Sequence, residues 1–479
     1  MPLKVNQVSD AVAAMQPALA KVEALMGGTE AMRAAGETYM PKWPAEKTDA
    51  YTIRLKTSTL YNVFGRTIGN MAGKPFTEPV KWTDIDTTVE AWFDNIDLAG
   101  RNLHVFAKEV FTSGVKDGIT HVLVDFPKTT GSDGKTILRT KAEEQAAGAR
   151  PCAIHIKQSQ ILGWKSERVA GTEQLTQVRI LESVTVPDGD FGSKTVAQVR
   201  LLEPGIWRLY RKNDKDEFVV YEEGTTTLKK IPLLTYYTKQ TGFMTATPPL
   251  IDLADLNIKH WQSQSDQDSL LHIARVPLLV RIGIDNSEQE APTNIGKSIT
   301  DLPTGGDMKY VEHSGQAIGS GRDSLNDLEG QMESMGAELL KVRPGDRTAT
   351  EASLDTAQAQ CQLSAMANGL EDFLDQVVDE MAGWVGLPNQ GDIDVFDDFA
   401  SIAVDSTTLA PFVTGMSTLV AAALLSPESA FEECKRYGVI NPDLTWEAEA
   451  EKIKAASMDL RGQSMQLNVK DTTIDETGA

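Results

Sequence analysis

The segment PPLIDLADLNIKHWQSQS, residues 248–265, decides which fold the chain is expected to have. Two prolines open it, and proline is well tolerated in the first turn of a helix. The segment predicts a helix over residues 250–275, about 39 Å long at the usual rise per residue. The centre of this helix, residues 262–269, is polar on every face, and a lone helix of that kind packs poorly. We therefore expect it to contact both neighbouring helices and water.

A second helix is predicted over residues 322–342, where apolar residues recur with three-four spacing. They form one narrow seam of Leu325, Leu328, Met332, Met335, Leu339 and Val342. The rest of the helix surface is strongly acidic and includes Asp327, Glu329, Glu333 and Glu338. We expect the seam to be buried against the first helix or a neighbouring subunit, because apolar area removed from water contributes about 25 cal/mol per Å².

The segment Arg343-Pro344-Gly345-Asp346-Arg347 ends the second helix, because proline lacks a backbone N–H and glycine favours turns. A third helix is predicted from about residue 351 to 384. Thr348 and Glu351 have the spacing of a capping box, and apolar residues continue one face as far as Trp384. This helix would be about 51 Å long, which exceeds the average for globular proteins.

The remaining parts of the chain differ from these helices in the spacing of their apolar residues and in composition. Residues 1–247 combine helical spacing, around 46–72 and 102–115, with alternating β patterns that dominate residues 151–237. Residues 276–321 contain a short apolar strand and many loop-forming residues, which predicts a small separate lobe. Residues 401–479 contain helical pieces and end in a polar tail. The fold class predicted from these patterns is α+β and rich in helix.

Composition restricts the function. The formal net charge of −22 argues against a protein that grips nucleic acid over its whole surface, although an acidic wall would let DNA pass without sticking. Simple solubility is the alternative explanation of that charge. Cys152, Cys361 and Cys434 are too few for a disulfide framework, which favours a reducing compartment. Residues 1–26 lack the pattern of a signal peptide, and the apolar run 416–425 is shorter than the roughly 20 residues that span a membrane.

Several short motifs imitate catalytic or metal sites without the context that those sites need. Gly296-Lys297-Ser298 lacks the first glycine of a phosphate loop, and Asp190-Phe191-Gly192 lacks the other kinase motifs. Ser113 and Lys116 have the spacing of some acyl enzymes but no companion motifs. The histidines form no zinc-binding pair, and the acidic run at 392–398 lacks the glycine and glutamate of a calcium loop, although a structural cation there stays open. We predict no catalytic residues, no metal site and no cofactor.

Longer strings resemble a family of bacteriophage portal-like proteins first described as a domain of unknown function. They comprise residues 27–41 (GGTEAMRAAGETYMP), then Tyr51, Arg54, Asn62, Arg66-Thr67 and Gly73 with Phe76, and further on Arg150-Pro151 with residues 160–164 (QILGW). The most specific part is residues 248–263, followed by Ser265-Asp266 and residues 274–277 (ARVP). The resemblance extends over residues 27–460, nearly the whole chain.

The resemblance implies a portal fold and a ring, usually of twelve copies. Residues 1–247 would form an α/β wing, 248–275 and 322–342 a two-helix stem, and 276–321 a small α/β clip. Residues 343–348 would be a tunnel loop, 349–400 a long helix returning to the wing, and 401–479 a helical crown region with the C-terminal tail.

The same resemblance implies a function at one capsid vertex. Double-stranded DNA would be packaged and ejected through the ring without sequence specificity. The ring would dock the terminase large subunit, a head-to-tail adaptor, and capsid and scaffold proteins. It would be assembled in the cytoplasm of a host bacterium, reside in the virion and have no contact with a membrane.

The implied roles fall on particular residues. Arg343, Asp346, Arg347 and Thr348 would lie in the tunnel loop, where the two arginines would contact passing phosphates or simply pair with nearby acids. Asp327, Glu329, Glu333 and Glu338 are candidates for the channel wall, with a solvated outer face as the alternative. Leu325, Leu328, Met332, Met335 and Leu339 would pack subunits together.

Two other classes of function stay open at this point. The chain would be an enzyme if convergent titratable side chains from distant segments met in a pocket. It would be a capsid assembly protein if it formed no central channel, although the lobe inserted between two long helices argues against that.

Overall fold

The computed structural model describes residues 3–127, 140, 143, 148–275, 278–282, 307–311, 316–337, 349–396, 406–436, 439–440 and 444–454. The chain divides into two compact units. Residues 1–341 and 365–396 form the first unit, and residues 342–364 and 397–479 form the second.

Most described helices belong to the first unit. They are α1 (Asp10–Met26), α2 (Gly28–Ala35), α3 (Thr48–Thr57), α4 (Val63–Gly73), α5 (Thr87–Glu90), α6 (Leu103–Asp117), α8 (Ile251–Ala274) and α9 (Gln316–Ala337). Helix α10 (Ala349–Val385) begins in the second unit and enters the first. Short 3₁₀ turns cover Gly36–Thr38, Lys74–Phe76, Phe93–Asn95 and Gln158–Gln160.

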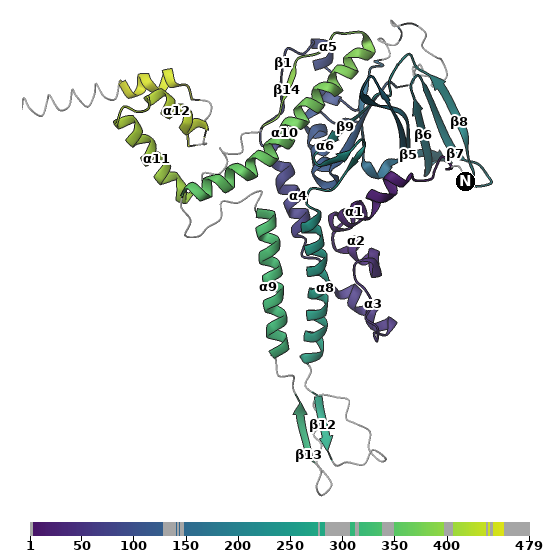
Figure 1. The fold of residues 1–479 in the computed structure, drawn as a ribbon, viewed down its shortest axis with the longest axis vertical. Coiled ribbons are helices and arrows are strands. Elements are labelled where there is room, and N and C mark those ends of the chain that lie inside the picture. Colours follow the sequence, from purple (N-terminus) through teal and green to yellow (C-terminus); the bar gives the residue numbers. More distant parts are fainter. Residues whose placement is uncertain are drawn as a thin grey trace, which may run out of the picture. The chain divides into compact units, whose positions relative to one another are not determined.

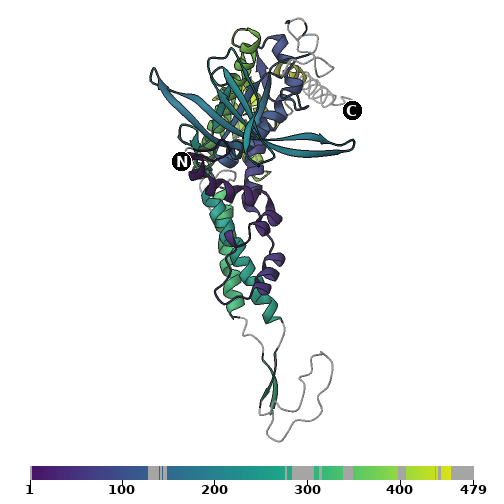
Figure 2. The same cartoon turned by 90° about the vertical axis from the view of Figure 1, so that its right-hand side faces the viewer.

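The largest sheet is an antiparallel meander in the order β4-β5-β6-β7-β8. Its strands are β4 (Ile161–Val169), β5 (Thr172–Asp188), β6 (Gly192–Glu203), β7 (Ile206–Lys212) and β8 (Phe218–Thr225). The two hairpins at the opposite ends of β5 extend away from the body of the sheet (Figure 2). Only the middle of β5, around Val178 and Ile180, is buried, so both ends of this long strand project into solvent.

The described residues also contain four smaller sheets. β3 (Cys152–Ile156), β2 (Ile119–Asp125) and β9 (Leu233–Tyr237) form an antiparallel sheet with β2 in the centre. The other pairs are β1 (Lys81–Thr83) with β14 (Asp392–Asp394), β10 (Gln240–Gly242) with β11 (Thr245–Ala246), and β12 (Leu278–Ile282) with β13 (Asp307–Val311).

The core of the first unit lies where helices meet the two larger sheets. Helix α6 contributes Phe106, Val110 and Phe111, which are fully buried. A second cluster joins α1 to the sheets through Val12, Leu123, Ile156, Ile161, Val178, Ile180, Leu202, Ile231, Leu233 and Met244. Local signals fix the helix ends, because the Asn102 side chain caps the first turn of α6 and Gly118 ends it with a positive φ of 83°.

Helices α8 and α9 lie side by side (Figure 1). Strand β12 begins four residues after the end of α8, and β13 ends five residues before the start of α9. The antiparallel β12–β13 pair therefore connects to the same end of the helix pair.

The second unit contains α11 (Ser406–Ala421), α12 (Pro427–Arg436) and a helical segment over residues 446–454. The hydroxyl of Ser426 accepts a hydrogen bond from the backbone N–H of Ser429, which caps α12. The rings of Phe431 and Trp446 lie 5.6 Å apart. The prediction of a helix-rich α+β fold is confirmed.

Candidate functional site

The polar centre of α8 is hydrogen-bonded within the chain. Asn257 has no exposed surface, and its side-chain oxygen accepts a 2.9 Å hydrogen bond from the backbone N–H of Phe64. Its amide donates to the backbone carbonyl of Tyr61, also at 2.9 Å. Gln262 donates to the carbonyl of Tyr39, and the hydroxyl of Ser265 lies 2.9 Å from that of Ser58. Residues 39–64 therefore supply the partners of this helix face.

These contacts agree with the prediction that the polar centre touches neighbouring helices and water together. Ser265 and Gln267 are buried and bonded within the chain, whereas Asp266 and Asp268 are exposed. Buried polar groups are tolerated when they are hydrogen-bonded, and those of α8 find partners in their own chain. The polarity of α8 is therefore no evidence for a neighbouring subunit. The partners lie about two hundred positions earlier in the sequence, so helical spacing alone gives no hint of them.

Arg54 anchors the segment that covers α8. It is buried, donates to both carboxylate oxygens of Glu46 at 2.8 Å, and donates to the carbonyl of Pro41 at 3.0 Å. The centre of its guanidinium lies 4.2 Å from the ring of Trp43. The hydrogen bond from Arg54 lowers the pKa of Glu46. Arg54 thus holds residues 41–54 together, a role that its place in the family-like string did not reveal.

The interface between α8 and α9 contains the predicted apolar seam. Leu325, Leu328 and Met332 are buried, Met335 is half-buried, and Leu339 and Val342 lie outside the described residues. Across the interface, Gln267 of α8 donates to the carbonyl of Ile318 at 3.0 Å. Within the chain, α9 packs against α8 and α4. Leu325, Leu328 and Met332 consequently have little surface left for contacts between copies.

The acidic residues of α9 occupy its other faces. Asp327 and Glu333 are exposed, and the side chain of Glu329 is 39% exposed. Glu329 approaches α8, where its Oε1 lies 3.2 Å from Nε2 of the buried His260. Glu329 is therefore positioned at the edge of the helix interface, whereas Asp327 and Glu333 point to solvent. Glu338 lies outside the described residues, as do Arg343, Asp346, Arg347 and Thr348 of the expected tunnel loop.

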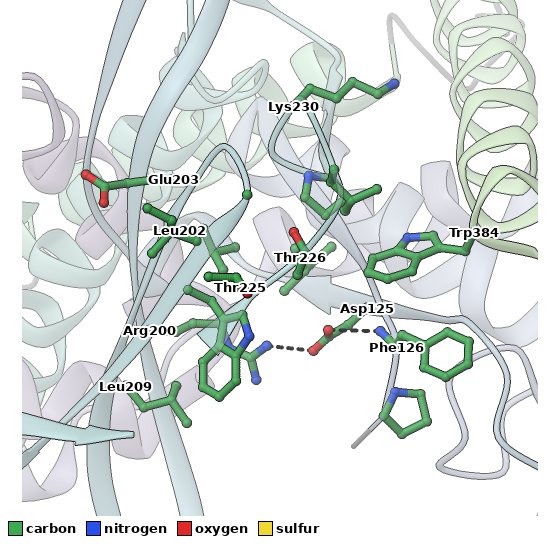
Figure 3. Close-up of a pocket in the computed structure, with 17 residues that line it drawn as sticks. Asp125, Phe126, Arg200, Leu202, Glu203, Leu209, Thr225, Thr226, Lys230 and Trp384 are labelled. Carbon is green, nitrogen blue, oxygen red and sulfur yellow. Dashed lines mark hydrogen bonds and ion pairs between the residues drawn. The ribbon is translucent and has the colours of Figure 1, made fainter. Parts of the chain in front are cut away.

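A cavity of about 550 Å³ lies between the two larger sheets and the end of α10 (Figure 3). Its walls combine apolar side chains from both sheets with Phe126 and Trp384, whose rings stack 5.8 Å apart. Arg200 reaches one wall and pairs with Asp125 at 2.6 Å, and also pairs with Glu182 at 2.6 Å. These ion pairs engage Arg200, and Lys230 of the same wall pairs with Glu380 at 2.6 Å. The described walls therefore combine apolar and aromatic side chains with charged groups that are already paired.

The sequence also raised the questions of a metal site and of a membrane-spanning helix. Among the described residues, no group of three or more His, Cys, Asp or Glu side chains is arranged to hold a metal ion. Asp392 and Asp394 are exposed on β14, and Asp397 and Asp398 lie outside the described residues. No helix within the described ranges is both long and apolar enough to cross a membrane.

Comparisons with known proteins match the same central region. A family described as a domain of unknown function (DUF4055) matches residues 249–385, which include α8, α9 and the described part of the lobe between them. No protein with a curated description matches the chain.

Among solved structures, the chain is similar to components of gene transfer agent (GTA) particles. A chain in the neck of the empty particle is 12% identical with a TM-score of 0.40, and the match covers 78% of this chain and 89% of that one. A chain in the native neck computed with C12 symmetry is 13% identical with a TM-score of 0.39, covering 77% and 88%. A chain of the native virion is 12% identical with a TM-score of 0.39, covering 84% and 97%.

Proposed function

We propose that this chain is the subunit of a portal, a ring at one vertex of a bacteriophage capsid through which double-stranded DNA is packaged and ejected. The observation that carries the proposal is the α8–α9 pair. Its apolar seam is buried inside the chain, its two helices lead into a two-stranded lobe at one end, and its free surface on α9 is acidic. Such a pair can stand beside copies of itself as the wall of a channel.

The acidic surface suits passage of DNA better than retention. A protein binds duplex DNA by placing Lys and Arg against phosphates and releasing counterions. The exposed Asp327 and Glu333 do the opposite, because they repel phosphates at short range. Together with Glu329 and Glu338 they are the proposed channel wall. The ring would act as a conduit, with no catalytic step of its own.

The other segments are assigned from their positions in the sequence relative to the two proposed stem helices. Residues 1–247 would form the wing, 276–321 the clip, 343–348 the tunnel loop with Arg343, Asp346, Arg347 and Thr348, 349–400 the helix returning to the wing, and 401–479 the crown region. The clip would dock the terminase large subunit and later a head-to-tail adaptor, and the wing would contact capsid and scaffold proteins. Assembly would take place in the host cytoplasm.

The experiment that tests this proposal is native mass spectrometry with electron microscopy of the purified full-length chain. We expect closed rings, with twelve copies as the leading number, and an axial opening wide enough for duplex DNA. A chain that stays monomeric at every protein and salt concentration, or that assembles without an axial opening, would contradict the proposal.

A further inference from the structure

The chain turns back after α10 and is tied to that helix by three carboxylates (Figure 1). Helix α10 ends at Val385, and Gly386 reverses the chain with a positive φ of 77°. The residues that follow, 386–396, are called the strap. The backbone N–H groups of Gln390, Ile393 and Val395 donate to α10 side chains at 2.7, 2.8 and 2.8 Å. Their acceptors are Asp379, Asp375 and Glu371, which we call the carboxylate ladder.

The spacing of the ladder matches that of the strap. Positions 371, 375 and 379 are four apart, so they share one face of α10 and lie about 6 Å apart along its axis. Alternate residues of an extended segment are about 6.7 Å apart, and their N–H groups point to the same side. Ile393 and Val395 therefore meet Asp375 and Glu371 in step. The opposite edge of β14 pairs with β1, so carboxylates of a helix take the place of a second neighbouring strand.

The strap buries little apolar surface of its own. Ile393 and Val395 are buried, whereas Asp392 and Asp394 between and before them are exposed, and the partner strand β1 has three residues. The same stretch of α10 is anchored far better, through the buried side chains of Leu370, Phe373, Leu374, Val377, Val378 and Met381. Segments with few buried apolar contacts open at lower free energy than the core. Local opening should therefore begin at the strap and leave α10 in place.

Docking the strap gathers negative charge around Asp375, which is half-buried. Burial raises the pKa of Asp375, the hydrogen bond from Ile393 opposes this, and nearby carboxylates raise it further. The charged groups around it are Glu371, Asp372 and Asp379 on α10, Asp392 and Asp394 on β14, and Lys81, Asp84 and Asp86 on and after β1. Lys81 is already paired with Glu78 at 2.8 Å. The hydrogen bonds of the ladder therefore form against repulsion between like charges.

The raised pKa fixes the direction of the pH effect. Docked, Asp375 keeps its proton to a higher pH than it does when the strap is released and its pKa returns toward 3.8. Docking is therefore strongest at low pH and weakens as the pH rises through the raised pKa. Salt should also strengthen docking, because it screens the repulsion between carboxylates. A ladder without this repulsion would behave in the opposite way, since an ionised carboxylate is the stronger acceptor.

We propose that the strap is a releasable tether, which the carboxylate ladder docks on α10 and which the negative charge gathered by docking predisposes to open. The chain passes into the second unit at residue 397, directly after the strap. While the strap is docked, this exit is fixed close to Glu371. Release would insert the 11 residues 386–396, up to roughly 36 Å of free chain, between α10 and that exit. The inference goes beyond the proposed function and holds whether or not copies form a ring.

Hydrogen exchange of the full-length chain, read at single amides by mass spectrometry, tests the tether. Protection at Ile393 and Val395 is compared with protection at Leu374 and Val377 in the core of α10, after correction for intrinsic exchange rates. We expect protection of the strap relative to the core to be severalfold higher at pH 4.5 than at pH 7.5, and higher in 0.5 M than in 0.05 M NaCl. Equal protection of strap and core throughout, or strap protection that falls with acid and with salt, would overturn the inference.

Variants separate the charge of the ladder from its hydrogen bonds. Asp375→Asn keeps an oxygen acceptor for the Ile393 N–H but carries no charge, so strap protection at pH 7.5 should rise severalfold and lose most of its pH dependence. Asp375→Ala removes the acceptor and should lower protection about tenfold.

Asp372→Ala is the matched control for these variants. Asp372 is exposed beside the ladder, and the three strap amides donate to other residues. Its replacement removes one charge and no acceptor, so strap protection should not fall. If Asp375→Asn lowered protection as much as Asp375→Ala does, the acceptor alone would hold the strap, and the proposed role of the charge would be wrong.

Discussion

At the scale of single residues, the clearest consequence of burial concerns His121 on β2. The ring has no exposed surface, and its nitrogens lie 2.9 Å from the hydroxyl of Thr235 and 2.7 Å from the side-chain oxygen of Gln158. Burial lowers the pKa of His121 from 6.5 to about 4. A neutral imidazole satisfies both neighbours, since it donates to Gln158 and accepts from Thr235. The residue is structural, as expected for a histidine outside any metal-binding pair.

This pKa predicts how stability depends on pH. Between about pH 6.5 and pH 4 the unfolded chain binds a proton at His121 that the folded chain does not. The free energy of unfolding therefore falls as the pH drops through that interval, by about 3 kcal/mol at most from this residue. His121→Gln should show a shallower fall when urea-unfolding midpoints are compared from pH 7.5 to pH 4.5. Asp117, whose pKa burial raises to about 6, acts in the opposite direction but is common to both proteins. Parallel curves would contradict the prediction.

At the scale of elements, two glycines of α9 provide a matched pair. A Cβ atom at position 336 would lie 2.8 Å from the hydroxyl of the buried Thr67 on α4, whereas at position 330 it would meet nothing within 4 Å. Gly336→Ala should destabilise the chain by about 1–3 kcal/mol, because the tight contact would be overpacked. Gly330→Ala should stabilise it by up to about 1 kcal/mol through helix propensity. Thermal unfolding distinguishes them, and stabilisation by both would show that α4 does not pack this closely on α9.

The positions of the long helices follow from the sequence, but several details do not. Spacing predicted helices over 250–275 and 351–384, close to the observed α8 and α10. Helix α9 begins at Gln316, six positions before the predicted start at residue 322. The prediction started too late because Gly319 and Gly321, taken in isolation, favour a loop. Gly321 lies inside α9 against the side-chain amide of Gln267, which would have to shift to admit a Cβ atom. A tertiary contact of that kind overrides local propensity, and the spacing of apolar residues does not reveal it.

The single helical pattern expected over residues 46–72 is also interrupted in the structure. It is divided into α3 and α4 by residues 58–62, which contain no glycine or proline. Ser58 ends the first piece and bonds to Ser265, while Asn62 caps the second and donates to the carbonyl of Leu25. These distant partners explain the break between α3 and α4. The periodicity of the sequence cannot predict them. For the site, the sequence predicted the acidic face and the apolar seam but not the cavity, whose walls come from four separate stretches.

At the scale of the whole molecule, the proposed channel wall can be tested by changing its charge. Asp327→Lys combined with Glu333→Lys should make assembled rings retain linear duplex DNA, with retention falling steeply as salt rises. A covalently closed circle of the same sequence cannot thread a ring and should not be retained. The control Asp214→Lys with Glu217→Lys, at the exposed turn between β7 and β8, should treat linear and circular DNA alike. Equal retention of both forms by the α9 variant would place Asp327 and Glu333 outside the channel.

The hydrogen bonds between α8 and residues 39–64 have a mechanical consequence. Apolar helix contacts tolerate a small slide along the axis, because one methyl group replaces another at little cost. The bonds made by Asn257 and Gln262 tolerate none, since each needs one particular backbone carbonyl or amide. A force along α8 would therefore also act on residues 39–64, and the two segments would move together as one rigid body. If α8 is a stem helix of the proposed ring, a motor pulling on one end of it would tilt or rotate α8 together with residues 39–64.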